Sequence, residues 1–107
     1  MISTPFLSII IPAHNEESRL AQTLDELLKF TSSQSYTSEI IIVENASVDH
    51  TLAIAKEYAG KHKNIIVLHD DRPGKGLAVK TGMLAASGDY RFICDADLSM
   101  PATEISR

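Results

Sequence analysis

The stretch Phe92-Ile93-Cys94-Asp95-Ala96-Asp97-Leu98 is an apolar run that ends in two acids separated by one small residue. Residues two apart in an extended backbone point the same way, so Asp95 and Asp97 can face one target. Two converging carboxylates repel each other unless a cation or hydrogen-bond donors lie between them. Mg²⁺, which binds one or two protein carboxylates together with substrate phosphates, would satisfy that demand. An isolated acid-x-acid pair is also typical of a helix cap or a turn, so the rest of the chain must decide.

The composition indicates one domain at most, with 107 residues and a net charge of -4. This acidic balance argues against nucleic acid as a partner, because binding a phosphate backbone needs a clustered positive surface. The single cysteine, Cys94, cannot form an internal disulfide and is expected to be a small buried residue, compatible with a reducing compartment. No export signal is recognisable and no apolar run approaches the ~20 residues of a membrane span, so we expect a cytoplasmic protein.

Four short apolar runs recur along the chain, and polar residues follow each of them. Runs of this length, rich in Ile, Val and Leu, predict strands covered on both faces and therefore a parallel sheet. The expected strands are 7–11, 39–43, 64–68 and 90–94. The connections are too long for hairpins and carry helical patterns. They predict right-handed βαβ units, and hence an α/β fold with a Rossmann-like parallel sheet flanked by helices.

Local signals predict where the strands and helices end. Pro12 is expected to end the first strand, and Asn15 to cap a helix that runs to about Phe30, with Glu16 and Glu17 in its first turn.

The second helix is expected to be capped by Ser47 or Asp49. A third helix is predicted over 77–86, and Gly88 is expected to adopt a left-handed conformation after it. Small residues along this third helix permit a close approach to the sheet. They are Ala78, Gly82 and Ala85.

Ligands of open α/β sheets bind outside the carboxyl ends of the strands. Four polar segments are expected there, namely 12–17, 44–49, 69–76 and 95–97. The first segment lacks the glycines of dinucleotide-binding folds and of P-loops, so backbone amides at the first helix are not expected to be the main diphosphate ligands. The four histidines lack the spacing of a metal site, and of the four we expect only His14 near the pocket.

These segments resemble the donor-binding half of family-2 glycosyltransferases with the GT-A fold. The matching stretches are SIIIPAHNEE at 8–17, EIIIVENASVDHT at 39–51, RPGKGLAVKTGM at 72–83 and SGDYRFICDADLS at 87–99. The DADLS and RPGKG forms are most similar to polyprenol-phosphate and dolichyl-phosphate sugar transferases. The resemblance implies that residues 1–107 are the nucleotide-sugar-binding part of a glycosyltransferase domain whose C-terminal acceptor half is absent.

The resemblance also implies roles in binding the nucleotide. Pro12 and Ala13, with Glu17 nearby, would line the pocket for the base and the ribose. Glu44 and Asn45 stand where the family usually has two acids, of which the second contacts the base. The neutral amide of Asn45 still donates and accepts hydrogen bonds, but it changes how the edge of a base is read.

The acid pair takes the metal-binding and catalytic role in this resemblance. Asp97 would bind the Mg²⁺ or Mn²⁺ that bridges the diphosphate, and Asp95 would lie near the ribose and the metal. Ser47 and Lys75 are further candidate substrate-binding residues, with Lys75 neutralising phosphate charge. The alternatives are that Asn45 and Ser47 are only turn and cap residues and that Lys75 is a solvated surface residue.

The implied activity is an inverting transfer of a sugar, expected to be a hexose, from a nucleoside diphosphate donor. A UDP-sugar is favoured, a GDP-sugar is the alternative, and a polyprenyl phosphate is the candidate acceptor, which would place the full-length protein at the cytoplasmic membrane face. A second hypothesis is a non-catalytic nucleotide or nucleotide-sugar binding module that another chain completes. A nucleotidyltransferase would need a glycine-rich loop after the first strand, and an aspartyl phosphatase usually carries its acid pair on the first strand.

A partial parallel sheet leaves its last edge and a helix face uncovered, so we expect the chain to form homo-oligomers. Light scattering at high protein concentration should give a mass above that of one chain. A monomer under those conditions would contradict this expectation.

Overall fold

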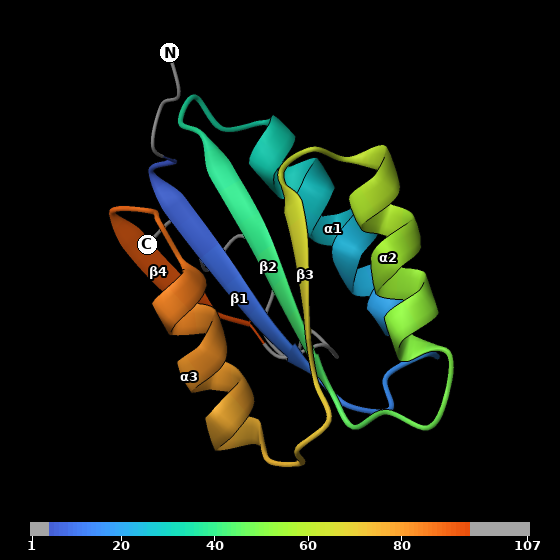
Figure 1. Cartoon of the computed structure of the whole chain (residues 1–107). Coiled ribbons are helices and arrows are strands. Elements are labelled where there is room, and N and C mark those ends of the chain that lie inside the picture. The colour runs from blue at the N-terminus through green and yellow to red at the C-terminus, as the bar shows by residue number, and fades with distance from the viewer. Residues whose placement is uncertain (1–4, 95–107) are drawn as a thin grey trace.

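A parallel sheet in the order β3-β2-β1-β4 forms the centre of the fold, and helices cover both of its faces (Figure 1). The computed structural model describes residues 5–94. The elements in chain order are β1 (Leu7–Ala13), α1 (Leu20–Ser32), β2 (Ser38–Asn45), α2 (Thr51–Lys61), β3 (Ile65–Asp70), α3 (Lys75–Ala85) and β4 (Tyr90–Ile93). The predicted α/β class and flanked parallel sheet are confirmed. The expectation that all four strands are covered on both faces is wrong for the edge strands β3 and β4, most of whose residues are partly or fully exposed. Among these three helices, none combines the length and the apolar character that crossing a bilayer requires.

The direction of the chain across the sheet reverses once. It passes from β1 to β2 to β3 with α1 and α2 on one face, and α3 then returns it along the other face to β4, beside β1 (Figure 1). Right-handed crossovers require the connecting helix to change faces when the direction reverses. The carboxyl ends of β1 and β4 therefore form the switch point at which open α/β sheets bind ligands.

The two central strands are buried on both faces, which explains why their sequences do not alternate between apolar and polar residues. Every residue of β1 is buried. Ile9 and Ile11 pack with α1 and α2, whereas Ile10 between them packs with α3. The larger core, between the sheet and the two helices α1 and α2, includes Leu20, Leu24, Leu27, Ile40, Ile42 and Ala55.

The expectation that Pro12 ends the first strand is wrong, because β1 continues through Pro12 to Ala13 and both residues pair with β2. The carbonyl oxygen of Ile10 accepts the Cys94 N–H at 2.9 Å, so the backbone groups of Ile10 face β4. Pro12, two residues later, has the same orientation. The missing N–H of Pro12 therefore removes no hydrogen bond to β2.

The first helix also begins later than its local signals predict. Asn15 does not cap it, and Glu16 and Glu17 lie outside its first turn, since α1 begins at Leu20. Asn15 has a positive φ of 52° and turns the chain away from the strand. Contacts with the β2–α2 loop, described below, use the polar groups of Asn15 and override the capping signal.

The small residues of α3 were predicted to approach the sheet, and two of the three do. Ala78 and Gly82 are buried, whereas Ala85 is exposed. A Cβ atom on Gly82 would lie 2.4 Å from Cγ2 of Ile10, well inside van der Waals contact. The absent side chain therefore lets α3 pack directly on β1, whereas Ala85, the last residue of the helix, is exposed to solvent.

Gly88 follows α3 but does not adopt the expected left-handed conformation; among the glycines in residues 5–94, only Gly74 has a positive φ, at 125°. Gly88 instead allows its own main chain to lie close to the main chain at the start of β1. A Cβ atom on Gly88 would lie 2.8 Å from the backbone nitrogen of Ser8 and 2.9 Å from the carbonyl carbon of Leu7. The turn into β4 therefore depends on the absence of a side chain at this position.

A buried carboxylate joins this turn to the central strands, which sequence reasoning did not foresee. Glu39 accepts hydrogen bonds from the Ser8 hydroxyl at 2.5 Å and from the Ser87 N–H at 2.7 Å, while the Ser8 oxygen accepts the Gly88 N–H at 2.8 Å. Burial raises the pKa of Glu39, but these hydrogen bonds outweigh it and hold the pKa below its ordinary value. The cluster ties β1, β2 and the α3–β4 turn together.

Replacing Gly88 by alanine should destabilise the protein by about 1–3 kcal/mol, because the added methyl group would overlap main-chain atoms that cannot move independently. Gly60→Ala is the matched control. Gly60 lies in α2, and a Cβ atom added there would meet nothing within 4 Å. This control should stabilise the protein by about 0.5–1 kcal/mol through helix propensity. Urea denaturation of both variants measures the difference, and equal effects would contradict the close packing.

Candidate functional site

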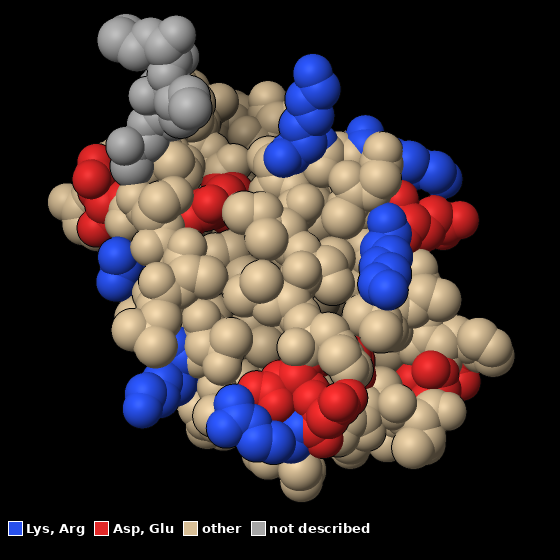
Figure 2. Space-filling model, viewed as in Figure 1, with Lys and Arg blue, Asp and Glu red and all other residues tan. Residues whose placement is uncertain are grey.

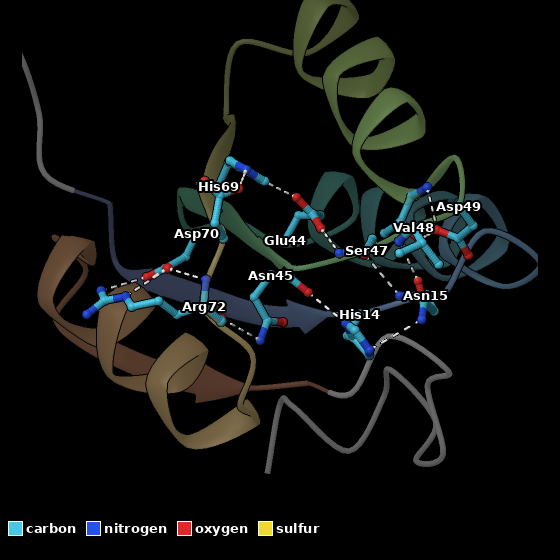
Figure 3. A network of polar contacts seen from close by, with 12 residues as sticks. His14, Asn15, Glu44, Asn45, Ser47, Val48, Asp49, His69, Asp70 and Arg72 are labelled. Carbon is cyan, nitrogen blue, oxygen red and sulfur yellow. Dashed lines mark hydrogen bonds and ion pairs between the residues drawn. The ribbon is translucent and has the colours of Figure 1, made fainter.

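Three loops meet at the carboxyl edge of the sheet and share one hydrogen-bond network (Figure 3). They connect β1 to α1, β2 to α2 and β3 to α3, so three of the four predicted polar segments do gather there. Cys94, the last described residue, is buried as expected and bonds to β1 at the same edge. The predicted site residues Asp95 and Asp97 lie outside the described residues.

The β1–α1 loop is fastened to the β2–α2 region by three successive amide groups. The pairs are Asn15 N–H to Ser47 Oγ (3.0 Å), Glu16 N–H to Thr51 Oγ1 (2.8 Å) and Glu17 N–H to Asp49 Oδ2 (3.3 Å). Amides near a helix N-terminus are the groups that hold phosphate in many nucleotide-binding folds. Here side chains already accept them, in agreement with the missing glycines of this segment.

The expectation that Ser47 or Asp49 caps the second helix is wrong, because the N-cap residue of α2 is His50, which makes no side-chain cap hydrogen bond. Asp49, one residue earlier, accepts the Thr51 N–H through its Oδ1 at 3.0 Å. Ser47, the other predicted cap, instead serves the β1–α1 loop through its hydroxyl.

Backbone strain is concentrated at this edge. Asn15 and Ala46 both have a φ of 52°. Asparagine tolerates that conformation, but for an alanine it costs roughly 1–2 kcal/mol. Tertiary bonds hold both residues, since the Ala46 N–H donates to the Asp70 carbonyl at 3.0 Å and Asn15 Oδ1 accepts the Val48 N–H at 2.9 Å. Strain that neighbouring contacts maintain in this way is typical of functional sites.

Glu44 is the most deeply buried charged side chain at this edge, with 1% of its surface exposed. Its carboxylate accepts the Ser47 N–H at 2.7 Å and a hydrogen bond from Nδ1 of His69. On its other side, Nε2 of His69 lies 2.6 Å from Oδ1 of Asp71. The imidazole therefore bridges two carboxylates, a role that the sequence did not reveal. The expectation that only His14 among the histidines lies near the pocket is wrong.

These contacts shift two pKa values in opposite directions. Burial raises the pKa of Glu44, but the hydrogen bonds from Ser47 and His69 outweigh it and leave the pKa below its ordinary value. Hydrogen bonds to Glu44 and then Asp71 raise the pKa of His69. The pair is therefore stabilised in its charged form.

Asn45, beside Glu44, has 3% of its surface exposed and contacts both neighbouring loops. Its amide nitrogen donates to the Gly74 carbonyl at 3.1 Å and, at a longer 3.5 Å, to the Arg72 carbonyl. The main-chain carbonyl oxygen of Asn45 lies 2.7 Å from Nδ1 of His14. A carbonyl can only accept, so this histidine nitrogen carries the proton.

Charges of both signs gather at this end of the molecule, below a broad uncharged face (Figure 2). Arg72 forms a two-pronged pair with Asp70, with Nε and Nη2 at 3.0 and 2.9 Å from its two carboxylate oxygens. Hydrogen bonds from Arg72 lower the pKa of Asp70 to about 2. Lys75 is the first residue of α3, which has no acid in its first turn.

The remaining predicted residues are distributed around this network. Pro12 and Ala13 are buried at the end of β1, and the Ala13 side chain packs in the core. Glu17 is exposed, and its Oε2 lies 3.0 Å from Nδ1 of His50. Within residues 5–94 the structure contains no cluster of three or more His, Cys, Asp or Glu side chains that could hold a metal ion.

Comparison with known proteins gives a family match over most of the chain. The model of Glycosyl transferase family 2 matches residues 8–107. A dolichyl-phosphate beta-glucosyltransferase of Drosophila melanogaster is 42% identical over 100 residues, which are 85% of this chain and 30% of that protein. A protein of the same name from Trichomonas vaginalis is 39% identical over 98 residues, covering 86% and 30%.

Solved structures agree with this match. A mannosyltransferase from Pyrobaculum calidifontis, in complex with GDP-Man and Mn²⁺, superposes with a TM-score of 0.75 at 28% identity, over 89% of this chain and 28% of that one. Glucosyl-3-phosphoglycerate synthase from Mycobacterium tuberculosis, in complex with UDP, gives a TM-score of 0.70 at 26% identity, over 88% and 34%. The chain therefore spans about a third of the length of these proteins.

The His69–Glu44 pair predicts a pH-dependent contribution to stability. The pKa of His69 is raised, so its contribution is complete below its unfolded value of about 6.5 and is lost as the pH rises through the higher folded value. The pKa of Glu44 is lowered, so its contribution is complete above about 4.3 and is lost as the pH falls through the lower folded value.

The difference in melting temperature between the wild type and His69→Gln should therefore be largest between roughly pH 4.5 and 6.5 and should shrink on either side. Thermal denaturation across the pH range measures it. His50→Gln is the control, because His50 and its partner Glu17 are both exposed. A difference that does not change with pH would contradict the charged pair.

Proposed function

The chain belongs to Glycosyl transferase family 2, and we propose that it is the donor-binding part of an inverting glycosyltransferase. The reaction would move a hexose from a nucleoside diphosphate to a polyprenyl phosphate. The observation that carries the proposal is the joining of three polar loops at the carboxyl edge, where the strand order reverses and ligands of such sheets bind. The identities of 39% and 42% to dolichyl-phosphate beta-glucosyltransferases support the choice of substrates.

The nucleotide would occupy the ends of β1 and β2, bounded by Pro12, Ala13, Glu17, Asn45 and Ser47. Figure 3 shows the amide nitrogen of Asn45 directed toward the segment of Arg72, with the oxygen pointing away from it. The oxygen end can only accept, which suits the ring N–H of uracil or of guanine. A UDP-sugar is favoured and a GDP-sugar is the alternative. Both kinds of nucleotide occur in the similar structures.

The diphosphate would be held by a divalent ion and by basic side chains. Two acids follow the carboxyl end of β4 in the sequence, and carboxylate oxygens are ligands that Mg²⁺ and Mn²⁺ prefer. Asp97 would be the main ligand, and Asp95 would lie between the ion and the ribose. When bound, the ion offsets the charge that develops on the diphosphate leaving group. Lys75, at the start of α3, would contribute positive charge on the opposite side of the pocket.

The acceptor would be an anion before the reaction begins. A lipid phosphate oxygen needs no general base to become nucleophilic, unlike a sugar hydroxyl. A polyprenyl phosphate acceptor would also place the full-length protein at the cytoplasmic face of a membrane. The names of the similar dolichyl-phosphate glucosyltransferases support this class of acceptor.

A thermal-shift titration tests the donor site. UDP-glucose and GDP-mannose, each with and without Mn²⁺, should raise the melting temperature only when the metal is present. A donor at a hundred times its dissociation constant stabilises by about 2.7 kcal/mol. Asp97→Ala should abolish this shift. Asp89→Ala, which removes an acid before β4 at the opposite end of the strand, should retain it.

Stabilisation that does not need the metal, and that Asp97→Ala retains, would contradict the proposed metal ligand. Full donor binding, with no transfer to a polyprenyl phosphate even by the full-length protein, would instead favour a non-catalytic binding module.

A further inference from the structure

We propose that Glu44 and Asn45 are positioning residues that hold the β3–α3 loop, residues 71–74, against the carboxyl end of β2. The significance of the loop rests on the proposed function, because the loop contains Arg72 and leads directly into Lys75.

Burial shows that both side chains are engaged within the protein. Glu44 and Asn45 are the last two residues of β2 and are 1% and 3% exposed. Buried polar groups are almost always hydrogen-bonded, and leaving one without a partner costs about 1–3 kcal/mol. The partners of the Glu44 carboxylate and of the Asn45 amide nitrogen are all supplied by the two following loops and the end of β3.

Glu44 holds the beginning of the loop through His69. The imidazole contacts Glu44 through Nδ1 and Asp71 through Nε2, at 2.6 Å for the second contact. The other charged groups near this imidazole are Asp70, which precedes Asp71, and its partner Arg72. The imidazole thus links β2 to the first residue of the loop.

Asn45 holds the end of the loop through its amide nitrogen. The Gly74 carbonyl accepts both this nitrogen at 3.1 Å and the Ala78 N–H at 3.2 Å. Carbonyl oxygens only accept, so the nitrogen of the amide must face them. An aspartate here would place a carboxylate oxygen against the Gly74 carbonyl oxygen. Asparagine is therefore required by the loop itself, independently of any contact with a base.

Asn45→Asp and Asn15→Asp form a matched pair for the test. Both substitutions change an amide to a carboxylate in the same network, but only the Asn45 nitrogen donates to the β3–α3 loop. Asn15 accepts the Val48 N–H through its oxygen, and its nitrogen lies 3.3 Å from Nε2 of His14. At neutral pH, Asn45→Asp should accelerate hydrogen exchange of the Ala78 amide about tenfold, whereas Asn15→Asp should leave it unchanged. The Cys94 amide, bonded to β1, is the internal reference for global stability.

Asn45→Ser is the second variant, because it removes the amide donor without adding a charge. It should show the same acceleration at Ala78, so the test survives if Asn45→Asp fails to fold. Equal exchange at Ala78 in the wild type and in Asn45→Ser would overturn the proposal. So would an effect of Asn15→Asp as large as that of Asn45→Asp.

Titration with UDP and Mn²⁺ separates this proposal from the proposed function. If the wild type binds UDP, Asn45→Ser should weaken binding about tenfold, and unchanged affinity together with faster exchange would overturn the link between the loop and the nucleotide. If the wild type does not bind UDP, the proposed donor is contradicted, and the exchange data alone decide whether Asn45 positions the loop.

Discussion

Burial of β1 and of nearly all of β2 on both faces is the constraint on which the rest of this structure depends. Apolar residues alternate between two cores, with Ile10 facing α3 and its neighbours Ile9 and Ile11 facing α1 and α2. Two covering layers require the chain to return along the opposite face, which the close packing at Gly82 and Gly88 makes sterically possible. Polar chemistry is then confined to the two ends of the central strands.

Two buried carboxylates, one near each end of β2, show how the strand ends differ. Isolated burial of either would cost several kcal/mol, so each needs donors. Glu39, at the amino end, is held by hydroxyl and amide groups that do not titrate. Glu44, at the carboxyl end, depends partly on His69, whose ring is partly exposed and titratable. The amino end is therefore a fixed anchor, whereas the carboxyl end can respond to protons.

Much of the architecture could be predicted because strand and core signals are local. The four strands, the parallel sheet, buried Cys94 and the gathering of polar loops all followed from runs of apolar residues and their spacing. The errors lie where a tertiary contact replaced a local preference. Pro12 stays in β1 because its backbone faces away from β2, and Asn15 does not cap α1 because the β2–α2 loop uses its polar groups. Gly88 serves packing instead of a left-handed turn.

The sequence by itself determined the layers of the fold and which segments reach the carboxyl edge. Apolar strand runs, helical patterns and polar segments follow one another along the chain, and each can be recognised from consecutive residues. It also determined the family, through four motifs in order. Only the tertiary structure decided which polar groups meet. Partners such as Asn15 and Ser47, or Glu44 and His69, are 32 and 25 residues apart, and the register of parallel strands brings them together. Hydrogen bonds need positions accurate to a few tenths of an ångström, which no local pattern specifies.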